Sequence, residues 1–284
     1  MEKIKIYINE KAHFFFLLPS ILGVMIFIFI PFGDSFLRSF CSSGSKKFNG
    51  IENYKEVFKN DAFSLAVKNT VLFTLICIPM LIIVSFIIAY ALSKLKYVIL
   101  IKSVFLFPMA VPTAVLVMIW KILFCDMGYV NNILTSMHLG KISFLNSSAS
   151  FALLVGSYIW KNLGYTILIW EAGIMGISES VIEAAKVDGA SEWQILRKIM
   201  IPSLKPTLYT ITIISFLNSF KVFREAYLVA GSYPHQSIYL LQHLFNNWFV
   251  NLDIDKMAAA SVMVFLVIFI SVSLLQRLWD SKEV

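Results

Sequence analysis

The sequence has few charged side chains for its length. Asp, Glu, Lys and Arg make up 14% of its 284 residues, against roughly 25% in soluble domains. Hydrophobic residues make up 58%, and 25 residues are phenylalanine. A soluble chain of this size cannot bury so much apolar surface, which excludes an ordinary cytosolic enzyme and a disordered chain. The composition predicts an all-α protein that lies largely in lipid.

Residues that could support catalysis or bind a metal are also scarce. Cys41, Cys77 and Cys125 lack the spacing of a metal or redox site, and the four histidines are scattered. The sequence has no Gly-x4-Gly-Lys-Ser/Thr loop for a triphosphate. We therefore expect no catalytic residue, no metal and no cofactor on this chain. Its net charge of +7 is interspersed with apolar runs, which favours membrane lipid over nucleic acid as a partner.

Long uncharged runs recur along the chain, and a helix needs roughly 20 apolar residues to cross a bilayer. The runs predict six transmembrane helices, over residues 14–33, 69–93, 103–123, 150–177, 203–223 and 256–278. The fourth run includes Lys161 and Glu171. The fifth has spanning length only if lysines at its ends extend to the headgroups. Pro108 and Pro112 predict a bend in the third helix.

The distribution of lysine indicates how the spans are oriented. Six spans place both termini on the same side of the membrane. Lysines before the first span and between the second and third favour a cytoplasmic segment at residues 1–13. Residues 34–68 and 224–255 would then be external loops, although the first of these carries six basic residues. Apolar residues at helical spacing predict an interfacial helix within residues 51–58.

The connection at residues 178–202 has the signals of two short helices. Ser178 or Ser180 can cap the start of the first helix, and Ser180 with Glu183 fits a capping box. Gly189 fits a helix stop, Ser191 a second start and Pro202 a second end. Several apolar side chains in this connection need a surface to cover them: Val181, Ile182, Ala184, Ala185, Trp193, Ile195 and Leu196. They either pack beneath the chain's own helix ends or bind a second protein.

The same connection resembles a known pattern. Glu183-Ala184-Ala185, Gly189 and Ile199-x-Ile201-Pro202 reproduce the EAA-x3-G-x9-I-x-L-P loop of the membrane subunits of binding-protein-dependent ABC importers, with Ile201 in place of Leu. Further segments are similar to the carbohydrate branch, the maltose and multiple-sugar type: Phe16-Leu17-Leu18-Pro19, Asp126-Met127-Gly128, Trp193-Gln194 and Gly231-Ser232-Tyr233-Pro234. The resemblance covers nearly the whole chain and is to the first of two different permeases.

This resemblance implies a permease subunit in the plasma (inner) membrane, with both termini in the cytoplasm. It implies three kinds of partner: a second permease in a heterodimer, two cytoplasmic ATPase subunits that bind ATP-Mg, and an extracellular or periplasmic sugar-binding protein. Residues 178–202 would provide a cytoplasmic coupling helix between the fourth and fifth spans. The residues it assigns to ATPase coupling are Glu183, Ala184, Ala185, Asp188, Gly189, Ile199 and Pro202.

Polar side chains within the last spans are candidates for a substrate path. Polar groups inside a membrane bundle usually face a cavity, and sugars bind to aromatic rings and amides. The candidates are Trp160, Asn162, Tyr165, Ser215, Asn218, Lys221 and Glu225. Alternatively, the Asn and Ser side chains join neighbouring helices, and Lys161 and Lys221 extend outward.

An ion-coupled secondary transporter of a small solute is the alternative function. Such a protein usually carries carboxylates in the middle of its spans. Here Glu171 and Glu225 lie near span ends. A sugar or a polyol is consistent with the resemblance as substrate.

Overall fold

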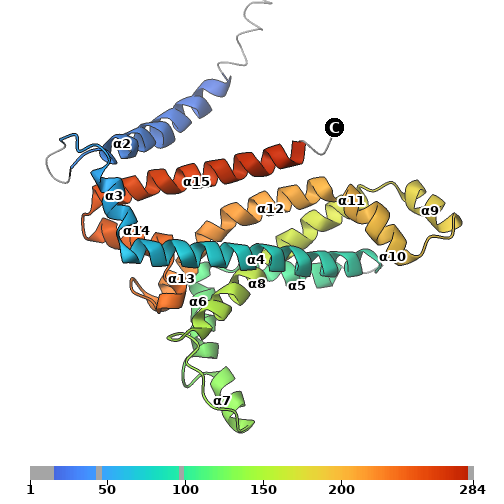
Figure 1. The fold of residues 1–284 in the computed structure, drawn as a ribbon. Coiled ribbons are helices and arrows are strands. Elements are labelled where there is room, and N and C mark those ends of the chain that lie inside the picture. The colour runs from blue at the N-terminus through green and yellow to red at the C-terminus, as the bar shows by residue number, and fades with distance from the viewer. Residues whose placement is uncertain (1–15, 43–46, 96–98, 281–284) are drawn as a thin grey trace, which may run out of the picture. The chain divides into compact units, whose positions relative to one another are not determined.

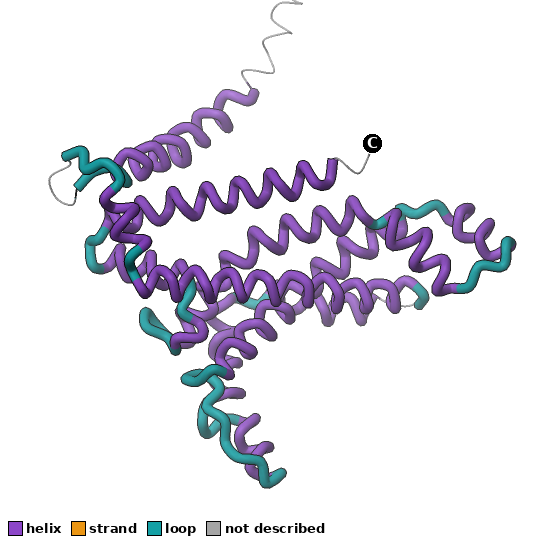
Figure 2. The backbone as a smooth tube through the Cα atoms, in the orientation of Figure 1, coloured by secondary structure: helices purple, strands orange, loops and turns teal. Residues whose placement is uncertain are grey.

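The computed structural model describes residues 16–42, 47–95 and 99–280 (Figure 1). These residues are mostly helical and contain no strand, apart from an isolated bridge between Cys41 and Phe48 (Figure 2). They divide into two compact units. One combines the described residues up to Asp61 with Asn247–Asp280, and the other comprises Ala62–Asn246. The predicted segment at residues 1–13 lies outside the described residues.

The first unit contains a helical stretch over Phe16–Arg38. This stretch includes the π-helical turn η1 (Met25–Phe29) and α2 (Ile30–Arg38), and the unit continues with α3 (Glu52–Phe58) and α15 (Ile254–Asp280). Phe32 packs on Phe265 of α15, with ring centroids 4.8 Å apart. The Asn53 amide donates to the carbonyls of Ser39 and Cys41, at 3.0 and 2.7 Å. The helix predicted within residues 51–58 is present as α3.

The remaining helices lie in the second unit, except that α4 begins one residue before it and α14 ends after it. They are α4 (Asp61–Ser93), α5 (Ile99–Ala110), α6 (Thr113–Phe124), α7 (Tyr129–Ser136), α8 (Ala149–Met175), α9 (Glu179–Val187), α10 (Glu192–Ile195), α11 (Ile201–Ser203), α12 (Lys205–Ser219), α13 (Phe223–Ala230) and α14 (Leu241–Val250). Short turns join some of them: the π-helical η2 (Leu196–Met200) and the 3-10 helices η3 (Phe220–Val222) and η4 (Gln236–Ile238).

The core of the second unit lies between α4, α8 and α12. Its buried apolar side chains include Phe73, Leu81, Ile167 and Ile211. Hydrogen bonds also cross between these helices, because buried polar groups in a membrane bundle require partners. The Trp170 indole donates to Ser85 at 3.1 Å, and the Tyr158 hydroxyl donates to the Ser215 carbonyl at 2.7 Å.

Gly164 allows α8 to pack closely against α5. A Cβ at this position would collide with the backbone carbonyl of Phe105. Small residues at helix crossings allow close backbone approach in membrane bundles. The α5–α8 contact therefore depends on the absence of a side chain at Gly164.

The helix boundaries differ from the uncharged runs in two places. Helix α4 begins at Asp61 rather than at residue 69, because Lys68 interrupts an apolar run but is a good helix former. Residues 103–123 are not one helix but belong to α5 and α6, which are separated at Val111 and Pro112. Pro112 disfavours the helical conformation of the residue before it, Val111. The predicted bend is therefore a complete break between two helices.

Four helical stretches among the described residues are long and apolar enough to cross a membrane: Phe16–Arg38, Asp61–Ser93, Thr113–Ser136 and Ile254–Arg277. A fifth candidate is the pair Glu192–Ser203 and Lys205–Ala230, which is bent by 61°. Helix α8 has 27 residues and is about 40 Å long, but it includes Lys161 and Glu171.

Candidate functional site

The EAA pattern lies on α9 and on the turn that ends it. The Ala190 N–H donates to the Ala185 carbonyl at 2.9 Å, and the Gly189 N–H donates to the Lys186 carbonyl at 3.0 Å. This pair of bonds defines a Schellman motif. Gly189 has φ +80°, a conformation that other residues adopt at a cost. The predicted helix stop at Gly189 is therefore confirmed.

The start of α9 agrees with Ser178, one of the two predicted starts, and not with Ser180. The helix begins at Glu179 after Ser178, and no side-chain hydrogen bond caps it. The hydroxyls of Ser178 and Ser180 bond to each other at 2.7 Å. The capping box predicted from Ser180 and Glu183 is therefore wrong, because the helix starts too early for Ser180 to be its cap.

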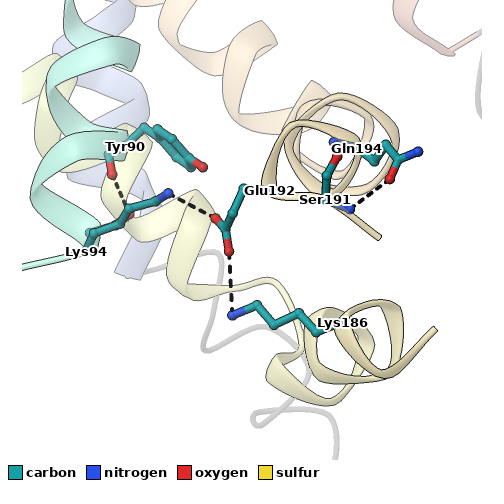
Figure 3. A network of polar contacts seen from close by, with 7 residues as sticks. Tyr90, Lys94, Lys186, Ser191, Glu192 and Gln194 are labelled. Atoms are coloured by element: carbon teal, nitrogen blue, oxygen red, sulfur yellow. Dashed lines mark hydrogen bonds and ion pairs between the residues drawn. The ribbon is translucent and has the colours of Figure 1, made fainter. Parts of the chain in front are cut away.

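A capping box does start the second helix (Figure 3). The Gln194 N–H donates to Ser191 Oγ at 3.3 Å, and the Ser191 N–H donates to Gln194 Oε1 at 2.7 Å. Residues 192–203 are then helical through α10, η2 and α11. The prediction that Pro202 ends this helix is wrong by a small margin, since the bend follows Ser203.

Some apolar residues of this loop are buried against the second unit, and others are exposed. Ile195 and Met200 are buried. Together with the half-buried Ile182, they line a cavity of about 450 Å³ beside the C-terminal ends of α4 and α8. Val187 is 88% exposed and Trp193 is 64% exposed. Packing beneath the chain's own helix ends is therefore confirmed for Ile182 and Ile195, and binding of a second protein at the exposed residues stays a prediction.

The residues assigned to coupling are accessible. Glu183, Ala184, Asp188, Gly189 and Pro202 are exposed, and Ala185 and Ile199 are half-buried. Figure 1 shows α9 and α10 at one end of α12, at the opposite end from α13. The EAA residues therefore lie at the end of the second unit that is formed by α9 and α10, where they are accessible to a partner.

Charged residues join the loop to α4 (Figure 3). Lys94 Nζ donates to Glu192 at 3.0 Å, and Lys186 Nζ lies 3.9 Å from the same carboxylate. The hydrogen bond from Lys94 holds the pKa of Glu192 below its usual value. Hydrogen bonds with Tyr90 and then with Glu192 raise the pKa of Lys94. These exposed contacts connect α9 and α10 to the end of α4.

A polar cavity of about 300 Å³ lies near the other end of α12. Five of the predicted path residues line it: Asn162, Tyr165, Asn218, Lys221 and Glu225. The other two lie outside it. The Trp160 ring packs on Trp120 with centroids 5.7 Å apart, and Ser215 is fully buried beneath Tyr158.

One chain of hydrogen bonds crosses the wall of this cavity. Lys221 Nζ donates to Asn218 Oδ1 at 2.9 Å, and Asn218 Nδ2 donates to the Tyr165 hydroxyl at 3.1 Å. These contacts fix the orientation of the Asn218 amide. They leave the Tyr165 proton available to an acceptor in the cavity.

An ion pair lies in the same wall. Lys161 Nζ contacts Glu225 Oε1 and also donates to Thr113 Oγ1 at 3.1 Å. Glu225 is 6% exposed, and its Oε2 has no hydrogen-bond partner among the described residues. Lys161 thus pairs within the bundle rather than extending outward. Glu171 likewise pairs with Lys102, at 3.0 Å.

Several cavity residues were absent from the predicted substrate path, among them Ser157, Tyr158 and Arg224. A usable signal was present for Tyr158. Residues 158, 161, 162 and 165 recur at the spacing of one helical face, and all four line the cavity. Arg224 has no comparable signal, because its position depends on where α12 passes through η3 into α13.

Comparison with known proteins identifies the architecture. Residues 81–283 match the family described as binding-protein-dependent transport system inner membrane component. The chain belongs to this family. It is a multi-pass membrane protein, a permease subunit of an ABC importer and a transport component rather than an enzyme.

Similar proteins extend over most of the chain. It is 27% identical to the trehalose/maltose transport system permease protein MalF of Thermococcus litoralis, covering 92% of this permease and 91% of the relative. It is 29% identical to the osmoprotective compounds uptake permease protein GgtC of Synechocystis, covering 75% and 79%. A bacterial ABC transporter that imports alginate has the same fold, with a TM-score of 0.83 at 20% identity over 98% of this chain and 99% of the other.

Proposed function

We propose that this permease forms half of a sugar pathway and is driven through α9 by a separate ATPase pair. The observation that carries the proposal is the exposed EAA helix, which ends in a defined turn at Gly189. The relatives named for trehalose, maltose and osmoprotective compounds support a sugar or sugar-like substrate. So does the cavity, where Tyr165, Asn162 and Asn218 provide an aromatic ring and amides.

Six spans are consistent with the helices. Helices α5 and α6 have 12 residues each, or about 18 Å, so each alone is too short to cross a bilayer. Together they can form one broken span. Helix α8 can form another, because its two charges lie in the pairs Lys161–Glu225 and Lys102–Glu171. Paired charges inside a bundle cost much less than charges exposed to lipid.

With six spans, both termini and α9 lie on the cytoplasmic side. The ATPase pair would then bind ATP-Mg and contact α9 there, and a sugar-binding protein would deliver substrate from the opposite side. A second permease would complete the pathway. The family's dependence on a binding protein, given in its description, supports this set of partners.

Helix α9 has the properties of a docking knob. Its EAA residues include the small Ala184 and Ala185, which permit close approach, and Glu183, which is exposed and can pair with a basic residue. The capping box at Ser191 and the Schellman motif at Gly189 fix the turn between α9 and α10. Closure of the ATPase dimer would move this knob and thereby the helices attached to it.

Substitution at Gly189 tests the coupling role. Nothing lies within 4 Å of a Cβ built at Gly189, so a substitution strains the backbone without causing a clash. Gly189→Val should abolish uptake and reduce co-purification of the ATPase, because β-branched residues strongly disfavour positive φ. Gly189→Asn is the matched control, since Asn tolerates this conformation, and should retain most uptake.

Co-purification of the second permease and membrane insertion should be the same in both variants. Normal uptake by Gly189→Val would contradict the role of this turn in coupling. Equal loss of uptake in both variants would show that the side chain matters rather than the backbone conformation.

A further inference from the structure

The polar cavity has an excess of positive charge. Lys161, Lys221 and Arg224 line it, and Glu225 is the one acidic residue among the described residues of its lining. The lining therefore has a net charge of +2. Lys161 is neutralised by Glu225, so the excess belongs to Lys221 and Arg224.

Neither of these two cations has a carboxylate partner among the described residues. Lys221 Nζ bonds to the neutral Asn218 amide at 2.9 Å, and no ion pair involves the Arg224 guanidinium in the described part of the chain. The nearby carboxylate of Glu225 is already bound to Lys161. Both cations therefore retain the capacity to bind an anion.

We infer that the solute taken by this cavity is an anionic saccharide, with a carboxylate or phosphate group bound by Lys221 and Arg224. The inference rests on the proposed function and narrows its substrate class. A guanidinium donates two parallel hydrogen bonds to either oxyanion, and an ammonium adds a point charge. A neutral sugar would enter the same cavity without compensating either cation.

The remaining lining fits the uncharged part of such a solute. The Asn162 and Asn218 amides and the Tyr165 hydroxyl are suited to sugar hydroxyls. The volume of about 300 Å³ is at the lower end of the range for small-molecule sites. The Lys161–Glu225 pair lies beside these groups, and its charges cancel, so it does not compete for the anion.

The test uses the complete importer in proteoliposomes, with its second permease, ATPase pair and binding protein. Uptake is measured for three probes: digalacturonate, glucose 6-phosphate and maltose. We expect uptake of at least one acidic probe. The choice between the first two identifies the acid as carboxylate or phosphate.

Variants of the two cations then test whether the preference for an acidic probe arises in the polar cavity. Lys221→Gln and Arg224→Gln should each slow acidic-probe uptake about tenfold, because each removes a charge-assisted hydrogen bond. Arg224→Lys should restore part of the rate. Lys121→Gln is the matched control, since Lys121 is exposed near the end of α6 and does not line the cavity.

Uptake of maltose alone would overturn the inference and leave the proposed function intact. If no saccharide is taken up, the proposed function fails, and the inference fails with it. An equal loss of acidic and neutral uptake in Arg224→Gln would also overturn the inference. So would loss of the second permease on purification of that variant, because the guanidinium would then belong to the subunit interface.

Discussion

Lys161 of α8 and Glu225 of α13 form an ion pair across 64 residues of sequence. The pair places a cation and an anion side by side in the wall of the polar cavity. It joins a residue of the fourth predicted span to a residue of the predicted loop at 224–255, two segments that the sequence analysis did not connect. Its position would allow α8 to contain a lysine and still form one of the proposed spans.

Removing one member of this pair should destabilise the permease. Glu225→Gln should lower the free energy of unfolding by roughly 2–4 kcal/mol, slightly less than for a fully buried pair, because Lys161 is partly exposed. The double variant Lys161→Met with Glu225→Leu should recover most of this loss. Thermal unfolding of the purified complex measures both, with Lys121→Gln as control. A single variant as stable as the parent would contradict a structural role for the pair.

Asn218 and Ser215 lie one turn apart on α12 and should respond differently to alanine. Asn218→Ala breaks the chain from Lys221 to Tyr165, so we expect uptake to fall about tenfold while the complex assembles normally. Ser215→Ala removes a buried hydroxyl without a hydrogen-bond partner and should leave uptake unchanged. Uptake kinetics and co-purification distinguish the two. Unchanged kinetics in Asn218→Ala would remove this residue from the substrate path.

Two glycines of α8 provide a second matched pair. Gly164→Ala places a Cβ against the Phe105 carbonyl and should cost roughly 1–3 kcal/mol through forced separation of α5 and α8. Gly156→Ala meets nothing within 4 Å and should stabilise α8 by about 0.5–1 kcal/mol. Thermal unfolding of the purified complex tests both. Equal effects would show that packing against Phe105 is not the reason for Gly164.

His243 should make stability depend on pH. It is fully buried, accepts a hydrogen bond from the Leu240 N–H at 3.2 Å and packs on Phe223. Burial lowers its pKa from 6.5 to about 4. The unfolded chain therefore binds a proton more readily, so stability is complete above pH 6.5 and falls on the order of 3 kcal/mol as the pH drops to about 4.

His243→Asn isolates this effect, because Asn keeps an acceptor but does not titrate. Its unfolding midpoint should change less between pH 7.5 and 5 than that of the parent protein. His138→Gln, at an exposed histidine, is the control and should behave like the parent. If His243→Asn and the parent protein lost stability equally between pH 7.5 and 5, His243 would not be the source of the pH dependence.

Local features of the sequence were predictable where neighbouring residues determine them. Gly189 was identified as a helix stop, and the break beside Pro112 follows from the geometry of proline itself. Of the six predicted spans, four to five coincide with helical stretches that are long and apolar enough to cross a membrane, and residues 150–177 are not among them. The Ser180 cap was wrong because serines two residues apart, Ser178 and Ser180, compete for the same role.

The cavity was only partly predictable. Asn162 and Asn218 could be selected as polar residues in apolar runs, but their distances to partners depend on how α8 meets α12. Arg224 and Glu225 are adjacent in sequence, yet one is exposed and the other is buried. No periodicity distinguishes them, because the 3-10 turn η3 shifts the helical phase immediately before them.

The π-helical turn η2 contains one more residue per turn than an α-helix would. The Ile201 N–H donates to the Leu196 carbonyl, five residues back. Four residues of an α-helix turn through about 400°, and the wider π-turn fits five residues into nearly the same rotation. Deleting one residue from Leu196–Met200 would therefore restore ordinary winding and leave the segments on either side facing nearly as they do now. The π-turn is thus a place where a single codon deletion shortens the chain without redirecting the EAA segment.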